Sequence, residues 1–489
     1  MAHNSCWRHI PKRFNSQYTS PPISPFSYIH VDALSDNRKE VIAKHLKELG
    51  PFPTYSNILN SQHFYQNTVL LDYLKKKPHP ISLRQLAGYG NVLTKQKIVS
   101  SANFVRIELP IRLAMRIRDL QTLPFGVVNN YHLAQVYESY YHSFDAFRKI
   151  PQIHTIEENE RFCKTLSTLL DDHLFNLSHL MMGALEVSIA ETLPQRELDT
   201  FMSSMLRSRI SRRVIVEEHL SLSENYQKNP YAKKPPHYLG EIFQNCRAVD
   251  HFNQVSEMAK ESMSQSFPEI KQMPNLEFEG NLNCSFQFMV PHLHYILYEI
   301  IRNSFEATIE THAKKGQVQQ SLPPVKVTIV DSKKEVLFRI SDQGGGINRE
   351  KLKLIWSFGK SPELARKSLA NFHKISGLPL NSRINPATMP SSEKQNVGHM
   401  TSSSSSSSSS SLSSSSAASW GTHKHSTLQR LMDREYEHKL GMGLPLSSVY
   451  ADYWNGNLQM NSIEGYGCDT ALTLSKLGYH TNVVQLDRA

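Results

Sequence analysis

The segment PHLHYILYEIIRNSFEATIE (291–310) decides how the second half of this chain folds. Its apolar residues recur at helical spacing, and the proline at its start suits the first turn of a helix. Four polar residues lie on the opposite face at i, i+4, i+7 and i+11: Glu299, Asn303, Glu306 and Glu310. The sequence therefore predicts a helix over 292–313 with one buried face and one face of acids and an amide.

Two glycine-rich segments follow this helix. Asp342-Gln-Gly-Gly-Gly346 comes after a strand-like run, and its glycines allow a backbone to approach a ligand closely. Gly441-Met-Gly-Leu-Pro445 precedes an apolar helix, whose exposed N–H groups and dipole favour phosphate. Asp342 can accept a hydrogen bond from an adenine amino group. Together with Asn303 as a neutral Mg²⁺ ligand and Glu299 as a proton acceptor, these segments predict an ATP site.

Strand-like runs surround the predicted helix. They span 284–290, 325–330, 336–341, 457–462 and 468–474. The last two are separated by glycines, which predicts a hairpin. The mixture predicts an α/β sandwich, in which helices cover one face of a sheet.

The region from about 40 to 250 has a helical pattern instead. Apolar residues recur at helical spacing in four successive stretches, at 113–120, 133–147, 162–180 and 198–206. Four such stretches in succession predict an antiparallel four-helix bundle. The expected fold class is therefore α + α/β, with an N-terminal four-helix bundle over 40–250 followed by an α/β sandwich over 251–479.

Composition excludes several classes of protein. No apolar run approaches the roughly 18–20 residues that span a bilayer, so no transmembrane segment is expected. The net charge of +10 is spread along the chain without a dense basic run, so nucleic-acid binding is not expected. The five cysteines show no paired spacing, which excludes a disulfide framework and a zinc site and fits a reducing compartment.

Two segments have the composition of unfolded chain. Residues 1–31 contain no Asp or Glu but several basic residues and serines, which is typical of a mitochondrial presequence and also of a disordered basic tail. Serine runs at 402–411 and 413–416 cannot bury enough apolar surface to offset the entropy of ordering. We therefore expect a disordered insertion in a loop over about 360–428.

The order of these motifs resembles the ATPase superfamily shared by gyrases, one class of heat-shock chaperones and bacterial histidine kinases. Within it, SDQGGGI, GMGLPLSSVYADYWNGNLQ, SIEGYGCDT and most of the opening segment look like the mitochondrial 2-oxo-acid dehydrogenase kinases. FVRIELPIRLAMRI, LPFG, LLDDH and LRSRISRRVIVEEHL look like the N-terminal bundle of that family, which bacterial histidine kinases do not share. The resemblance covers roughly 80–479, apart from the serine-rich insertion.

This resemblance implies a serine protein kinase that uses ATP and Mg²⁺. It would phosphorylate and inactivate the E1α subunit of the pyruvate dehydrogenase complex in the mitochondrial matrix, dock on the lipoyl domain of E2, and form a homo- or heterodimer. A kinase of the branched-chain complex stays open, because Tyr295 and the LLDDH segment resemble that branch. An E2-docked scaffold with weak catalysis and a histidine kinase that uses His219 or His173 are further alternatives.

The resemblance also implies roles for single residues. Glu299 would be the general base, Asn303 the Mg²⁺ ligand and Asp342 the adenine acceptor. The other nucleotide contacts would come from Gly344, Gly346, Lys360, Ser361, Gly441, Met442, Gly443 and Leu444. A regulatory 2-oxo-acid site would be formed by Ser208, Arg209 and His173.

Three positions depart from the motifs of this family. Glu306 stands where the family usually has a basic residue, and Lys439 stands where it has the first glycine of the phosphate loop. Cys468 replaces a hydroxyl residue near the adenine position. These departures bear on nucleotide affinity and substrate choice more than on the fold.

Overall fold

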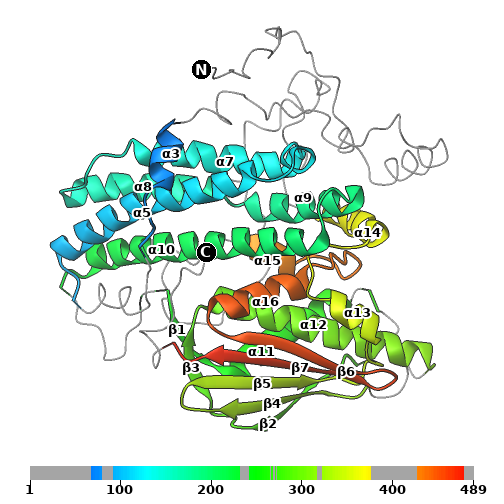
Figure 1. The fold of residues 1–489 in the computed structure, drawn as a ribbon. Helices are drawn as coiled ribbons and strands as arrows, with labels where there is room; N and C mark the ends of the chain where they lie inside the picture. Colours follow the sequence, from blue (N-terminus) through cyan, green and yellow to red (C-terminus); the bar gives the residue numbers. More distant parts are fainter. Residues whose placement is uncertain are drawn as a thin grey trace, which may run out of the picture.

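The computed structural model describes residues 68–79, 92–231, 240, 242–264, 266–267, 270, 272–316, 322–375 and 427–477. A helical part lies beside a mixed sheet whose one face is covered by helices (Figure 1), which confirms the α + α/β class. The predicted presequence over 1–31 and the serine runs lie outside the described residues.

The helical part is formed by long helices that follow one another in the chain. They are α5 (Lys95–Gln121), α7 (Tyr131–Arg148), α8 (Ile156–Asp172), α9 (Asn176–Ala190) and α10 (Gln195–Lys228), with the short α3 (Thr68–Leu74) and α6 (Phe125–Val128). Side chains cap their starts. Thr94 accepts from the N–H of Lys97, and Thr155 forms a capping box with Glu158.

The third predicted helical stretch, 162–180, is two helices rather than one. Helix α8 ends at Asp172, His173 is its C-cap, and α9 begins at Asn176. The apolar spacing continues across this break because both helices bury leucines in the same core. Periodicity reports the buried face and not the continuity of the backbone, so the prediction of one stretch is wrong here.

The main sheet has the strand order β2-β4-β5-β7-β6. Its strands are β2 (Leu276–Gly280), β4 (Val325–Asp331), β5 (Glu335–Ser341), β6 (Asn457–Ile463) and β7 (Gly467–Ser475). Strands β2 and β4 are parallel, and the other pairs are antiparallel. The predicted β6–β7 hairpin is confirmed, with Ile463 paired to Gly467.

A separate pair of short strands, β1 (Gln244–Arg247) and β3 (Ser285–Phe288), lies at the edge of this part. The sequence pattern predicted β3, β4, β5, β6 and β7 but not β1 or β2. Strand β1 (QNCR) has no apolar alternation, and β2 (LEFEG) alternates over only five residues, none of which is fully buried, so its signal is weak.

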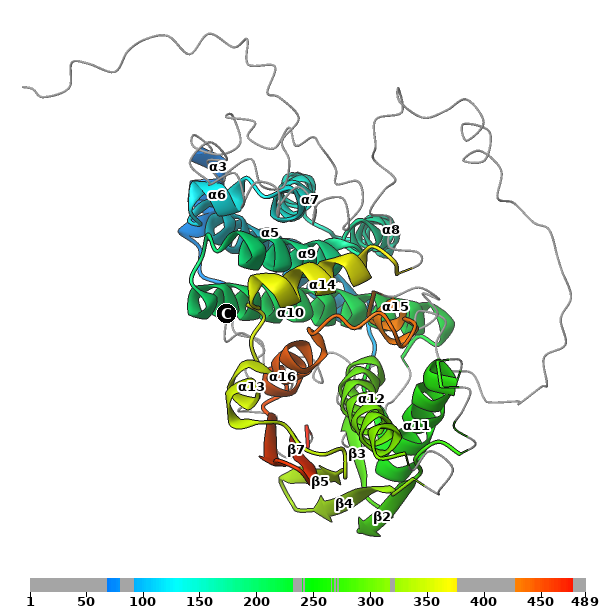
Figure 2. The same ribbon diagram turned by 90° about the vertical axis from the view of Figure 1, so that its right-hand side faces the viewer.

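Helices α11 (Ala248–Ser264), α12 (Val290–Lys314) and α16 (Gly443–Tyr453) lie between the sheet and α10 (Figure 2). Helix α12 is the predicted helix, and Pro291 lies in its first turn. Its stripe of Leu293, Ile296 and Ile300 is buried in a core that continues from the sheet into the helical part.

Three short helices connect the two parts: α13 (Arg349–Leu354), α14 (Pro362–Phe372) and α15 (Thr427–Met432). Helix α14 packs along α9 (Figures 1 and 2). The turn before it is held by Asp199 of α10, whose carboxylate accepts from the N–H groups of Phe358 and Gly359 at 2.6 and 3.1 Å. The chain after β5 is therefore anchored to the helical part.

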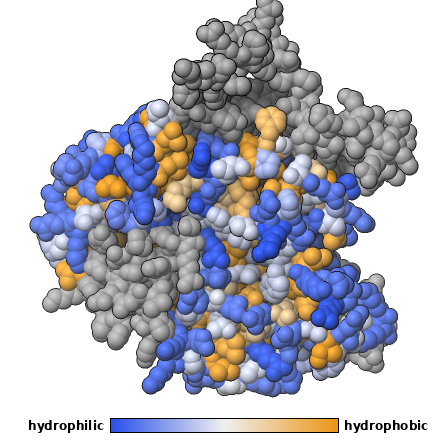
Figure 3. All heavy atoms as spheres, in the orientation of Figure 1, coloured by the Kyte–Doolittle hydropathy of each residue, from blue (hydrophilic) through white to orange (hydrophobic). Residues whose placement is uncertain are grey.

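The face seen in Figure 3 is mostly hydrophilic, with hydrophobic residues in small scattered groups. Among the described residues, no helix is both long and apolar enough to cross a membrane.

Candidate functional site

A cleft of about 410 Å³ lies between α12, the turn after β5 and the segment that leads into α16. The structure thus brings the three sequence motifs together. The predicted site residues that line it are Glu299, Asn303, Asp342, Gly344, Gly346, Lys360, Gly441, Gly443 and Leu444. Met442 is buried beneath the loop instead, and Ser361 caps α14.

Glu299 is held by an arginine that sequence reasoning missed. Its side chain is 2% exposed, and its two oxygens accept from Nη1 and Nη2 of Arg434 at 2.7 and 3.0 Å. Although burial opposes it, the Glu299 carboxylate raises the pKa of Arg434 above its ordinary value. A buried bidentate pair of this kind fixes the orientation of both side chains.

A second missed arginine fixes the backbone that carries Arg434. Arg302 of α12 donates to the carbonyl groups of Arg434, Glu435 and Tyr436 at 3.3, 3.1 and 3.0 Å. No motif marks either arginine. The only sequence signal is that a carboxylate on the cleft side of a buried helix requires a cation. This signal does not identify the residue that supplies the cation.

Asn303 lies one helical turn beyond Glu299 and lines the same cleft. Its side-chain amide makes no hydrogen bond to another residue in the described part of the chain. An amide oxygen without a protein partner, beside acids and a glycine loop, fits a hard cation such as Mg²⁺.

Asp342 lies where β5 meets the glycine turn. Its Oδ1 accepts from the N–H groups of Gly344 and Cys468 at 2.9 and 3.2 Å. Burial raises the pKa of Asp342, and these two N–H groups oppose that rise. Oδ1 is therefore used within the protein, and the carboxylate lines the cleft with acceptor capacity left over.

The loop before α16 requires glycine at two positions for different reasons. Gly441 has a φ of +66°, which few other residues adopt without strain. A Cβ at Gly443 would lie 2.0 Å from Oε2 of Glu299, so the loop packs directly on the buried carboxylate. Helix α16 begins at Gly443, so its N-terminus and free N–H groups face the cleft.

Lys360 lines the cleft beside the glycine loop, where its Cε would lie 3.6 Å from a Cβ placed at Gly441. Its Nζ donates to the carbonyl of Ser357 at 2.7 Å. Burial lowers the pKa of Lys360 to about 8.

Two of the departures from the family motifs touch each other. The Nζ of Lys439 forms ion pairs with Glu306 and with Glu310, the second at 2.8 Å. The Tyr436 hydroxyl also donates to Glu310 at 2.9 Å. We call Lys439, Glu306, Glu310 and Tyr436 the Lys439 cluster.

The third departure, Cys468, lies at the Asp342 end of the cleft. Its thiol donates to the hydroxyl of Ser462 at 3.5 Å. Burial raises the pKa of the Cys468 thiol, which is therefore protonated and acts as a small packing group with a weak donor.

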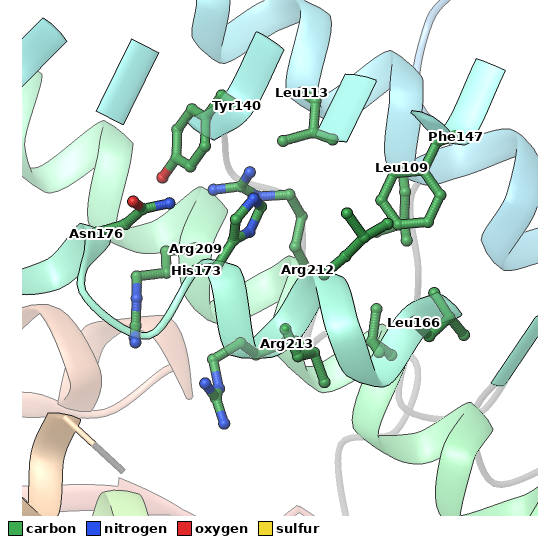
Figure 4. Close-up of a pocket in the computed structure, with 13 residues that line it drawn as sticks. Leu109, Leu113, Tyr140, Phe147, Leu166, His173, Asn176, Arg209, Arg212 and Arg213 are labelled. Carbon is green, nitrogen blue, oxygen red and sulfur yellow. The ribbon is translucent and has the colours of Figure 1, made fainter. Parts of the chain in front are cut away.

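A second, smaller cavity of about 40 Å³ lies inside the helical part (Figure 4). The side chains of His173, Arg209, Arg212 and Arg213 line it, and among the described residues no acidic side chain does. Burial and then the Arg212 charge lower the pKa of His173 to about 3, so this imidazole is neutral. Of the predicted regulatory residues, Ser208 does not line the cavity; its carbonyl accepts from Nε of Arg212.

Two guanidinium groups of this cavity have unsatisfied nitrogens. Nε of Arg209 and Nη1 of Arg212 are buried without a hydrogen-bond partner in the described part of the chain. Arg212 lies over the ring of Tyr140 at 4.3 Å. Excess positive charge with orphaned donors fits a small anion.

Comparisons with known proteins place the chain in a family. A family model described as mitochondrial branched-chain alpha-ketoacid dehydrogenase kinase matches residues 80–243. The chain is 40% identical over 477 residues to mitochondrial [pyruvate dehydrogenase (acetyl-transferring)] kinase 2 of Saccharomyces cerevisiae, covering 94% of this chain and 96% of that protein.

More distant relatives have the same printed activity. The identity is 27% over 399 residues to the mitochondrial [pyruvate dehydrogenase (acetyl-transferring)] kinase of Arabidopsis thaliana, covering 81% of this chain and 90% of that protein. It is 24% over 418 residues to isozyme 4 of Homo sapiens, covering 83% of each chain. Given 40% identity over nearly the full length of both proteins, the chain belongs to the mitochondrial pyruvate dehydrogenase kinase family.

Proposed function

We propose that this chain is a protein-serine kinase that phosphorylates and inactivates the E1α subunit of the mitochondrial pyruvate dehydrogenase complex, with ATP as the phosphoryl donor. One observation carries the proposal. The cleft collects Glu299, Asn303, Asp342 and the loop at Gly441 from motifs that are far apart in the sequence, in a chain that belongs to this family.

The nucleotide would lie across this cleft. Asp342 accepts a hydrogen bond from the adenine amino group, and the glycine turn leaves room for the flat base. The N–H groups at the start of α16 face the phosphates. The free amide of Asn303 would hold a Mg²⁺ ion, which would neutralise phosphate charge.

Glu299 accepts the proton of the substrate serine. Arg434 holds this carboxylate in one orientation, and each of its oxygens retains acceptor capacity beyond the arginine bond. A loose transition state for phosphoryl transfer depends little on the strength of the general base and mainly on orientation and charge. A carboxylate held by two hydrogen bonds from Arg434 supplies both.

The wider architecture follows the same proposal. The helical region 40–250 would be the family's four-helix bundle, with α8 and α9 together as its third member, and would serve regulation and docking on the E2 lipoyl domain. The region 251–479 would be the gyrase-type ATP-binding domain, with the serine-rich insertion over about 360–428 in its lid. Relatives named as mitochondrial support the mitochondrion as the location, and we propose the matrix and a dimeric state.

The cavity in the helical part would be the regulatory site for a 2-oxo acid. Its carboxylate would meet Arg209 and Arg212, whose buried nitrogens have no partner in the described part of the chain. His173 lines the same cavity in its neutral form.

The branched-chain 2-oxo-acid dehydrogenase complex is the second candidate substrate. The family model over 80–243 carries the name of that kinase and favours it. Tyr295, which is buried beside Glu299, also resembles that branch.

One experiment tests the main proposal and separates the substrates. The protein is incubated with labelled ATP and either purified pyruvate or branched-chain dehydrogenase complex. We expect acid-stable label on the pyruvate E1α, falling about 10²- to 10⁴-fold in Glu299→Gln, as for loss of a general base. Asn303→Ala should abolish label as well.

The control is Glu350→Gln, which removes an exposed carboxylate outside the cleft and should leave the label unchanged. Label on the branched-chain E1α alone would move the substrate to the second candidate. Acid-labile label on the kinase itself would overturn the serine-kinase proposal. Nucleotide binding without any transfer would leave a catalytically weak scaffold.

A further inference from the structure

The cleft is lined by four cationic side chains, and all four have partners within the protein. Arg434 is bound to Glu299, and Arg302 is bound to backbone carbonyls. Lys360 donates to the carbonyl of Ser357 and lies in a buried position. These three are anchored where they are.

Lys439 differs from the other three cations in exposure and in partners. Its side chain is 41% exposed, whereas that of Arg434 is 6% exposed. Its partners, Glu306 and Glu310, are side chains on the polar face of α12 rather than carbonyl groups. A lysine on a four-carbon stem can exchange such partners by rotation of single bonds.

The backbone of Lys439 is fixed even though its side chain can move. Its carbonyl accepts from Nδ2 of Asn371 at 2.8 Å. Gly441 follows two residues later and lines the cleft, so the lysine is placed at the entrance of the phosphate loop. Glu306 lies three residues after Asn303 on α12, so the present ion pair is next to the expected metal ligand.

Charge decides what this arrangement can bind. Glu306 on the helix would repel a polyphosphate, while Lys439 attracts one. Bound ATP carries several negative charges close together, which compete with two separate carboxylates for one ammonium group.

We propose that Lys439 is a phosphate-binding cation of this site, and that Glu306 and Glu310 hold it when no nucleotide is bound. This inference rests on the proposed function, because it requires that the cleft binds ATP. It assigns a function to the two departures together: the acid at 306 on the helix is matched by the base at 439 on the loop.

Equilibrium binding of Mg-ATP and of adenosine to the full chain tests the inference. Lys439→Gln should weaken ATP binding about ten- to hundredfold, as expected for a charge-assisted hydrogen bond, and change adenosine binding less than about twofold. Glu306→Gln should tighten ATP binding in the wild-type background, since Lys439 is then held by Glu310 alone and no acid at 306 repels the phosphates.

The double variant Lys439→Gln with Glu306→Gln is the decisive measurement. If Lys439 binds phosphate, the double variant stays as weak as Lys439→Gln alone, within about threefold. If Lys439 only neutralises Glu306, removing the acid restores wild-type affinity in the double variant, and the inference is overturned.

Lys476→Gln is the matched control, because Lys476 also forms an ion pair, with Asp331 at the end of β4. Asp331 pairs with Val336 at the start of β5, whereas Asp342 follows the end of β5. It should change neither ligand's affinity. Equal weakening of ATP and adenosine in Lys439→Gln would mean a structural role and would overturn the inference. If the wild-type protein binds neither Mg-ATP nor adenosine, the proposed function itself is overturned.

Discussion

The cleft beside the sheet and the cavity inside the helices both collect arginines, but they balance that charge differently. In the cleft, Arg434 meets Glu299, and Lys439 meets Glu306 and Glu310. In the cavity, Arg213 pairs with Glu217, whereas Arg209 and Arg212 carry buried nitrogens without a partner in the described part of the chain. No acidic side chain of the described residues lines this space. The cleft thus pairs its cations with acids that line it, whereas no acid lines the cavity beside Arg209 and Arg212.

The difference teaches what each site requires from a ligand. A ligand of the cleft must displace protein groups that already pair with the lining residues, so its affinity depends on how well it competes with those groups. A ligand of the cavity completes a set of unsatisfied donors, so a single small anion relieves both repulsion and burial cost. Removing one residue of an ion pair in the cleft should therefore lower the free energy of unfolding strongly. Removing one arginine from the cavity should lower it little.

The largest expected change in the free energy of unfolding comes from a residue of the cleft. Arg434→Met leaves the carboxylate of Glu299 buried without its cation, which should lower the free energy of unfolding by about 3–5 kcal/mol. Chemical denaturation measures it. Arg434→Lys, which keeps the charge but not the bidentate geometry, should lose less. A loss below about 1 kcal/mol in Arg434→Met would show that the pair does not carry the buried charge.

The second effect concerns pH and the cavity. His173 has a folded pKa of about 3, while the unfolded chain takes up a proton near pH 6.5. Stability is therefore full above pH 6.5 and falls as the pH drops towards 3. At pH 5 this one residue should cost roughly 2 kcal/mol relative to pH 7, at 1.36 kcal/mol per pH unit.

Unfolding measured at pH 7 and pH 5 checks this. His173→Gln should reduce the acid-induced loss of stability. The exposed His154→Gln is the control and should follow the wild type. An unchanged pH dependence in His173→Gln would mean that His173 does not stay neutral in the cavity.

The third effect is ligand binding in the cavity. Pyruvate or a branched-chain 2-oxo acid at ten times its dissociation constant should stabilise the fold by about 1.4 kcal/mol. The shift in melting temperature measures this, and Arg209→Gln should remove it. The same shift in Arg209→Gln would show that the acid binds elsewhere.

The smallest effect is the removal of one cation from the cavity. Arg212→Met should change the free energy of unfolding by less than about 1 kcal/mol, because lost packing on Tyr140 is offset by relief of a partly unsatisfied buried charge. Arg118→Met, at an exposed position of α5, is the control. A loss comparable to that of Arg434→Met would remove the contrast between the two sites.

Much of the candidate site could be predicted from the sequence because its parts are local motifs. A turn of glycines, an amide one helical turn from a carboxylate and a glycine loop before a helix each need only a few neighbouring residues. The structure brings Asn303, Asp342 and Gly441 to one cleft, as expected. Met442 and Ser361 do not line the cleft with the others, and their predicted nucleotide contacts stay predictions, because the direction of a side chain depends on packing beyond the motif.

The order of the elements, the periods of their apolar residues and the identities of the glycine turns follow from the sequence by itself. Only the tertiary structure decided which charges meet. Glu299 and Arg434 are 135 residues apart, and Glu306 and Lys439 belong to different elements, so no local pattern relates them. The physical reason is that the energy of an ion pair depends on distance and burial in space, which the spacing of residues along a chain does not report.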